Sequence, residues 1–190
     1  MTAKEDLHTY LRQAREALVW KMDGLSSYDV RRPLVPTGTN LLGLVKHVTG
    51  ITSGYFGVTF GRPFPEPVPW FGTGAEPNAD MWATPDESRE HIVGLYHRVW
   101  SHADATIGAL DLDAVGHVPW WAPGNEVTLN RILTHMLAEL NRHAGHADIL
   151  RELLDGDAGW RSPGDHLAST SPQWWAEHRA RLEAAAQKAA

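Results

Sequence analysis

The sequence contains no cysteine, and this absence removes several kinds of chemistry at once. Disulfide bonds, cysteine-ligated zinc sites and cysteine nucleophiles are all excluded. The chain also has no block of basic residues, and its formal net charge is −6 with the histidines neutral. Nucleic acids bind to clustered lysine and arginine side chains, so we expect no nucleic-acid partner.

Long apolar runs are missing as well. No stretch reaches the roughly 18–20 consecutive apolar residues that a membrane-spanning helix requires. Residues 1–6 carry two acids and no apolar segment, which is unlike a signal peptide. We therefore expect a cytoplasmic protein that has no membrane partner.

The chain is instead rich in histidine and tryptophan, with 11 and 9 copies respectively. Its 190 residues suit one domain, and the 43% that are hydrophobic are enough for a full core. Histidine binds metals and carries protons near neutral pH, whereas tryptophan fills cores and lines pockets. For most of the scattered histidines, a simple bias in composition is a sufficient explanation.

Hydrophobic periodicity predicts five helices. We expect them at about residues 4–22, from Asn40 to the 57–61 region, from Pro85 to about 110, from the Thr128 cap to about 155, and at 173–186. No strong alternating pattern predicts a β-strand. The predicted fold is therefore all-α: a four-helix bundle over residues 1–160, and a C-terminal extension, residues 161–190, with a short helix packed on the bundle.

Two loops carry several tryptophans. The irregular segment 62–83 is rich in proline and contains Trp70 and Trp82, and the loop before the fourth predicted helix contains Trp120 and Trp121. Loops as long as the first are usually functional or disordered, and its aromatic residues argue against disorder. These tryptophans either form a ligand pocket or a partner surface, or they only cover one end of the helices.

The fourth predicted helix has an unusual polar stripe. At about 100° per residue, four ionisable residues fall on one narrow face that also carries apolar side chains: His135, Glu139, His143 and His146, beside Ile132, Leu150 and Leu153. The polar residues Asn141, Asp148 and Glu152 lie on the opposite side. Because buried charges need a partner or a metal, an inward-facing stripe of this kind indicates a site.

Glu139 and His143 are four residues apart, so both can reach one ion from the same helix. His47, which shares an apolar face with Leu44 and Ile51, is the best candidate for a third ligand from another helix. Three protein ligands leave a position open, as in catalytic zinc sites. The pattern alone fits a metal site no better than it fits an arrangement without a metal. In that arrangement His47 is a hydrogen-bonded core histidine, and Glu139 and His143 form a buried hydrogen-bonded pair.

Three separated segments carry a resemblance to a known family. They are TLNRILTHMLAELNRHAGHADILRE at residues 128–152, RPLVPTGTNLLGLVKH at residues 32–47 and PWWAPG at residues 119–124. Together they resemble the DinB-like superfamily, and most closely its actinobacterial mini-DinB branch, which is related to thiol-dependent maleylpyruvate isomerases. The resemblance covers roughly residues 5–160.

The resemblance implies a four-helix bundle of up-down-down-up topology that holds a divalent metal. The ligand positions of the family match His47, Glu139 and His143. The resemblance further implies that His146 and Arg142 contact substrate or support the ligands, and that His135 packs beside them. Zinc is the metal we expect, although nickel, iron and manganese also suit two nitrogens and one carboxylate. Because many relatives are dimers, we expect a homodimer.

Three functions remain open on this basis. The first is a metal-dependent transferase or isomerase that uses a low-molecular-weight thiol and a small-molecule substrate, with a metal-dependent hydrolase as a close variant. The second is a non-catalytic, stress-related protein that binds a metal or a small molecule. The third is a purely structural bundle with an empty site.

Overall fold

The computed structural model describes residues 2–72, 74–121 and 123–189. In chain order the elements are α1 (Ala3–Trp20), α2 (Leu41–Phe56), the short 3-10 helices η1 (Val58–Phe60) and η2 (Ala79–Met81), α3 (Arg89–Ala109), β1 (Val115–His117), β2 (Glu126–Thr128), α4 (Leu129–Asp155) and α5 (Pro172–Lys188). The prediction of an all-α fold of DinB type is confirmed. Ala122 of the PWWAPG segment lies outside the described residues.

Polar residues at the predicted positions start the helices that carry the candidate site. The side-chain oxygen of Asn40 accepts the backbone N–H of Gly43 at 2.8 Å and so caps α2. Thr128 caps α4 in the same way, through Arg131. Gly156 ends α4 with a left-handed backbone (φ 84°), which glycine adopts without a steric penalty. These caps fix where α2 and α4 begin and end relative to their ligand residues.

The start of α3 differs from the prediction. The sequence Thr84-Pro85-Asp86-Glu87 predicts the first helical turn, yet α3 begins at Arg89 and is capped by the Ser88 hydroxyl. Glu87 does accept the Thr84 N–H at 2.8 Å, as a capping box requires. Its carboxylate also pairs with Lys46 of α2 at 2.7 Å. The predicted turn therefore serves as a tether to α2 and is not part of the helix.

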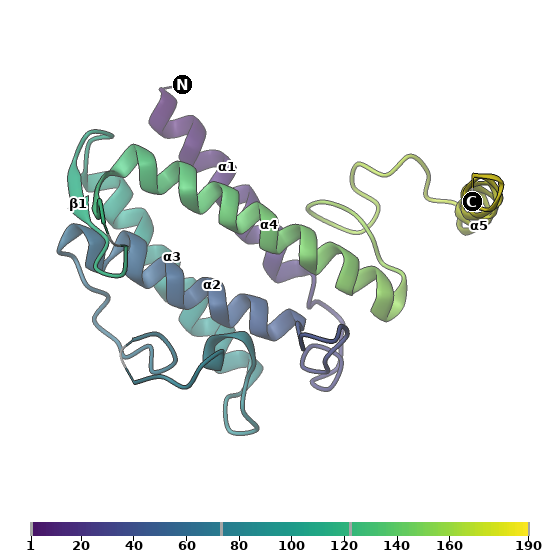
Figure 1. Cartoon of the computed structure of the whole chain (residues 1–190), viewed down its shortest axis with the longest axis horizontal. Coiled ribbons are helices and arrows are strands. Elements are labelled where there is room, and N and C mark those ends of the chain that lie inside the picture. The colour runs from purple at the N-terminus through teal and green to yellow at the C-terminus, as the bar shows by residue number, and fades with distance from the viewer. Residues whose placement is uncertain (1, 73, 122, 190) are drawn as a thin grey trace.

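A small hairpin was not predicted. β1 and β2 pair in antiparallel register, with Gly116 opposite Val127. Each strand has only three residues, which is too short to show the alternation that identifies strands in a sequence. The hairpin presents the loop that contains Trp120 and Trp121 (Figure 1).

Hydrogen bonds between helix ends define the directions of the four long helices. Lys4, at the start of α1, donates to the carbonyl of Leu110 at 2.6 Å, just after α3. Arg151, near the end of α4, donates to the residue that follows α1. The pair of Lys46 with Glu87 places the start of α2 beside the start of α3. Thus α1 and α4 run one way and α2 and α3 the other, which is the predicted up-down-down-up order (Figure 1).

The helix α2 lies at the centre of the packing. All of its residues are buried except His47. Its apolar side chains join one core with buried residues of α1, α3 and α4, among them Leu11, Tyr96 and Leu140. Burial on nearly every side explains the near-continuous apolar sequence of this helix. It also means that the single partly exposed residue of α2 is the candidate ligand.

The C-terminal segment differs from the body formed by α1–α4. Figure 1 shows α5 beyond the end of α4, at the far end of an irregular connection. None of the described residues of α5 is buried, and the large side chains of Trp175 and Leu182 are exposed. The predicted packing of this helix on the body and the division of the chain near residue 160 stay predictions.

Among the described residues, no helix combines the length and the apolar character that crossing a membrane would require.

Candidate metal centre

The structure brings the three predicted ligand residues together between α2 and α4. One nitrogen each from His47 and His143 and one carboxylate oxygen of Glu139 all lie within 4.8 Å of one another. The two imidazole rings meet edge to face, with their centroids 4.7 Å apart. Within the described ranges, this is the one group of three or more such side chains with ligand atoms so close. The spacing suits a single ion that touches all three residues.

His143 has the most unusual surroundings of the three. Its side chain is 10% exposed, and neither ring nitrogen has a hydrogen-bond partner. Glu139 Oε2 is 3.6 Å from His143 Nε2, which is too far for a hydrogen bond. The alternative of a buried hydrogen-bonded Glu139–His143 pair is therefore absent from the structure. A buried polar atom without a partner is unfavourable, and a metal ion would satisfy this one.

Burial also fixes the charge of His143. Desolvation, reinforced by the neighbouring His47 and His146, lowers the pKa of His143 to about 4. The imidazole is thus neutral at pH 7, and a neutral imidazole is the form that binds metals. The fit of the donor set to a divalent metal rests on this neutral, partnerless ring beside a second imidazole and a carboxylate.

Asp80 is a functional candidate that no sequence pattern predicts. His47 Nδ1 lies 2.6 Å from Asp80 Oδ2, so the carboxylate holds the ring and leaves Nε2 as the free nitrogen. Such carboxylate–histidine pairs orient metal ligands and raise their basicity. Asp80 comes from η2, 33 residues after His47 in the chain, within the long 62–83 loop. No local pattern links the two positions, so only the folded chain identifies the pair.

The other residues of α4 that the sequence places near the ligands differ in their exposure. His146 and Arg142 are exposed, and the ring of His146 lies 5.7 Å from that of His143. His135 is half-buried against Tyr55, at 4.9 Å between centroids. Leu153, which was expected to face inward, is 63% exposed. Near its end, the inward face of α4 instead carries Arg151, which is buried, and Leu154, which packs against the core.

The four loop tryptophans separate into different environments. Trp70 is buried against Leu95 and Val99 and donates its indole N–H to the carbonyl of Lys46. Trp82 is exposed and has no aromatic neighbour among the described residues. Trp120 and Trp121 contact Tyr55 of α2, and Tyr55 contacts His135 of α4, so the rings of these two tryptophans lie beside the seam between α2 and α4.

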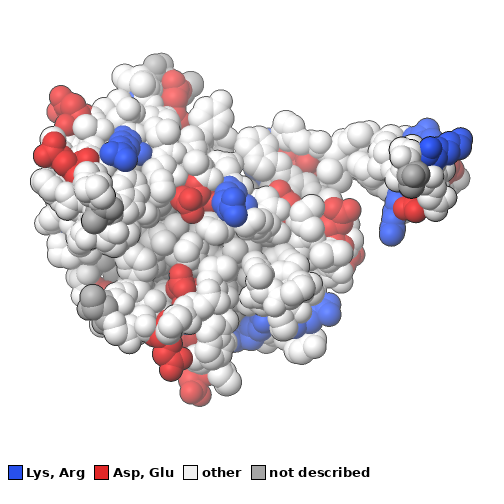
Figure 2. All heavy atoms as spheres, in the orientation of Figure 1, with Lys and Arg blue, Asp and Glu red and all other residues white. Residues whose placement is uncertain are grey.

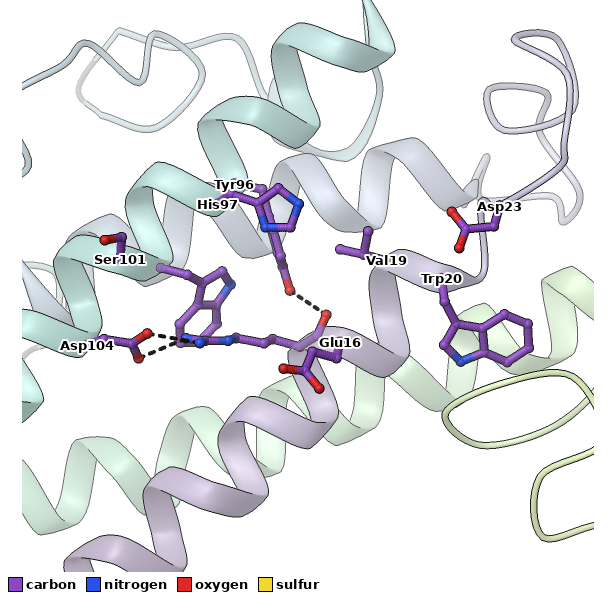
Figure 3. A pocket seen from close by; sticks show the side chains of 10 residues that line it. Glu16, Val19, Trp20, Asp23, Tyr96, His97, Ser101 and Asp104 are labelled. Atoms are coloured by element: carbon purple, nitrogen blue, oxygen red, sulfur yellow. Dashed lines mark hydrogen bonds and ion pairs between the residues drawn. The ribbon is translucent and has the colours of Figure 1, made fainter.

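A cavity of about 400 Å³ lies elsewhere, between α1 and α3 (Figure 3). The Arg15 guanidinium crosses it and donates to both carboxylate oxygens of Asp104 at 2.8 and 2.9 Å. The Tyr96 hydroxyl donates to the carbonyl of Arg15 at 2.9 Å. These polar groups therefore bind one another and tie α1 to α3, and the three candidate ligands do not line this cavity.

Replacing Asp80 by asparagine tests its support of His47. The amide removes the negative charge that orients the imidazole, so we expect zinc affinity to fall by roughly 10–100-fold. Competition with a fluorescent chelator would measure the affinity. Asp86→Asn is the matched control, since Asp86 is an exposed acid in the same loop region. Equal zinc affinity in the wild type and Asp80→Asn would contradict the role given to Asp80.

Comparison with known families agrees with this arrangement. The sequence model of the family described as mycothiol-S-transferase matches residues 6–156, which run from the first turn of α1 to the end of α4 and include all three candidate ligands. No match was found among curated proteins. The match covers well over half of the chain and is consistent with the DinB-like resemblance of its segments. The chain belongs to the mycothiol-S-transferase family.

Proposed function

We propose that this protein is a metal-dependent S-transferase that joins a low-molecular-weight thiol to an electrophilic small molecule. The observation that carries the proposal is the buried, partnerless imidazole of His143, set within 4.8 Å of His47 and Glu139 ligand atoms. The name of the family supports mycothiol as the thiol.

In this proposal His47, Glu139 and His143 hold the ion, and zinc is the metal expected. A divalent metal bound there supplies Lewis acidity, which lowers the pKa of a thiol or of a water molecule. Each histidine contributes one nitrogen, and Asp80 keeps His47 turned so that its Nε2 is available. Glu139 contributes one negative charge from a partly exposed position. Three protein ligands leave room for a substrate atom.

The reaction balances without any further reagent. The thiol loses its S–H proton to solvent, and the sulfur forms a bond to the electrophilic carbon. The leaving group departs with the electron pair of the bond that breaks. The face of the molecule that carries α2 and α4 has only scattered charged residues (Figure 2), which suits an uncharged electrophile.

The proposal also includes a homodimer, a cytoplasmic location and a C-terminal extension that begins near residue 161. The exposed Trp175 and Leu182 of α5 would suit contact with a second copy. Size measured by light scattering would test the dimer.

A thiol-dependence assay tests the proposed function. Zinc-loaded protein would be mixed with 1-chloro-2,4-dinitrobenzene, with and without mycothiol, and the thioether product would be quantified. We expect product only when zinc, protein and mycothiol are all present. Release of chloride without added thiol would instead support the hydrolase. If no zinc binds when it is supplied, the transferase proposal is wrong and a structural role is favoured.

A further inference from the structure

Five ring side chains form a contiguous cluster where the last turn of α2 meets the second turn of α4. We call this cluster the aromatic shelf, and it consists of Tyr55, Phe71, Trp120, Trp121 and His135. Tyr55 lies at its centre: its ring centroid is 5.2 Å from Trp120, 5.7 Å from Trp121 and 4.9 Å from His135. Phe71 extends the cluster at 5.7 Å from Trp120.

Tyr55 and His135 lie about two helical turns along the seam from the two candidate histidine ligands. Tyr55 follows His47 by eight residues on α2, and His135 precedes His143 by eight residues on α4. The two helices run in opposite directions, so these positions stay opposite each other, about 12 Å along the seam. Glu139 lies midway, four residues from His135 and four from His143. A substrate that extends from the ligands along the seam toward Tyr55 therefore reaches the shelf.

Two glycines of α2, Gly50 and Gly54, allow these rings to lie close to the helix. A Cβ atom at Gly54 would come within 2.7 Å of both Phe71 and Trp120, which real side chains do not tolerate. Gly50 is in similarly close contact with Phe71. Glycine inside a helix is destabilising by roughly 0.5–1 kcal/mol relative to alanine, so these positions give up helix stability for the close approach.

Hydrogen bonds then fix the rings in place. The Trp121 indole N–H donates to the Tyr55 hydroxyl at 3.2 Å. Arg131 lies over Trp121 at 5.1 Å and holds its outer face. Despite these contacts, Trp120 keeps 43% of its surface exposed. Trp120 is the one exposed ring of the five, and an exposed, well-supported indole can receive a flat ring by stacking.

We propose that the aromatic shelf is the electrophile subsite of this enzyme and that it selects planar, uncharged aromatic groups by stacking on Trp120. This inference rests on the proposed S-transferase function, because it assigns the second substrate of the same site. Stacked or edge-to-face ring contacts contribute modestly, so we expect removal of the Trp120 ring to weaken aromatic binding by roughly 3–10-fold.

The first test measures binding and needs no turnover. Titration calorimetry with 1,3-dinitrobenzene, which is flat and uncharged and lacks the halide leaving group, would be carried out on zinc-loaded wild type and on Trp120→Leu. We expect roughly 3–10-fold weaker binding in the variant. Tyr10→Leu is the control, since Tyr10 is a 57% exposed aromatic residue on α1, outside the shelf and the candidate metal centre. Equal affinity in the wild type and Trp120→Leu would overturn the proposal.

The second test separates the shelf from the chemistry. With mycothiol present, Trp120→Leu should raise KM for 1-chloro-2,4-dinitrobenzene while leaving zinc content, and the kcat and KM for the small aliphatic electrophile iodoacetamide, unchanged. A loss of activity toward both electrophiles would show that Trp120 has a structural role, and this would overturn the shelf. If neither the wild type nor Trp120→Leu transfers the thiol, but Trp120→Leu binds 1,3-dinitrobenzene more weakly, the S-transferase proposal fails while the aromatic binding site stands.

Discussion

The His143→Ala protein is expected to lose both stoichiometric metal and thiol-transfer activity. Removing a residue that only supports a ligand already weakens metal binding by roughly 10–100-fold, and a direct ligand has a larger effect. His143 is also the most buried of the three candidate ligands, so solvent cannot replace its nitrogen easily. Its loss would leave one imidazole and one partly exposed carboxylate, which is too few donors for a stable zinc site.

Elemental analysis of the untagged wild type, His143→Ala and His47→Ala proteins would measure this effect. We expect about one zinc per chain in the wild type, in line with a three-ligand site, and none in either variant. His146→Ala is the control on the same helix, because His146 is exposed and we expect it to keep the metal. Circular dichroism would establish that the variants are folded. Stoichiometric metal in His143→Ala would show that the ligand set is wrong.

The sequence was sufficient to predict the positions that follow from local chemistry. The cap at Thr128 and the αL glycine at Gly156 define α4, and both were readable because capping depends on residues only a few positions apart. The i, i+4 spacing likewise places Glu139 and His143 on one face. Helical spacing also places His47 on the same face of its helix as Leu44 and Ile51. In the structure this face meets α4, and His47 lies beside Glu139 and His143.

Contacts across the chain were not readable. Asp80 lies in a loop without periodicity, so nothing in its neighbourhood indicates that it binds His47. The start of α3 was misplaced because Glu87 has a second partner, Lys46, on another helix. Leu153 has the spacing of an inward residue, but it is exposed, and its neighbour Leu154 packs against the core instead. In each case a tertiary contact, or its absence, overrides a correct local rule.

The tryptophan loops show the same limit for function. The sequence indicates that the four loop tryptophans either form a ligand pocket or a partner surface, or cover one end of the helices. It does not show which of the four belongs to which role: Trp70, Trp82, Trp120 and Trp121. In the structure Trp70 is a core residue under its loop, whereas Trp120 stands on α2 next to the seam. The glycines that permit this approach are ordinary helix residues in the sequence, and only the packed rings reveal why they are small.

A buried arginine near the end of α4 links α4 to the end of α1, beside the ion pair of Lys21 with Asp148 at 2.6 Å. The Arg151 side chain is 5% exposed, and its guanidinium donates to the carbonyls of Lys21 and Asp23 at 3.0 and 2.8 Å. It also pairs with Asp155 and Asp157, each at 2.8 Å. One planar fork thus satisfies two backbone carbonyls and two carboxylates, which a lysine could not do.

Replacing Arg151 by methionine is therefore expected to destabilise the fold by about 3 kcal/mol. The apolar side chain keeps much of the volume but leaves the two carbonyls without their donor, and breaking a buried ion pair by removing one partner is strongly unfavourable. In a chain of this length the melting temperature should fall by roughly 6–12 °C. Calorimetry would measure this change.

Two further variants serve as controls. Arg151→Lys should keep only part of the stability that Arg151→Met loses, because lysine lacks the planar fork of donors. Arg142→Met, at an exposed position of the same helix, should change the free energy of unfolding by less than about 0.5 kcal/mol. If both methionine variants melted alike, the Arg151 contacts would contribute no more than an exposed arginine does, and α1 and α4 would be held together by the shared apolar core and the Lys21–Asp148 pair.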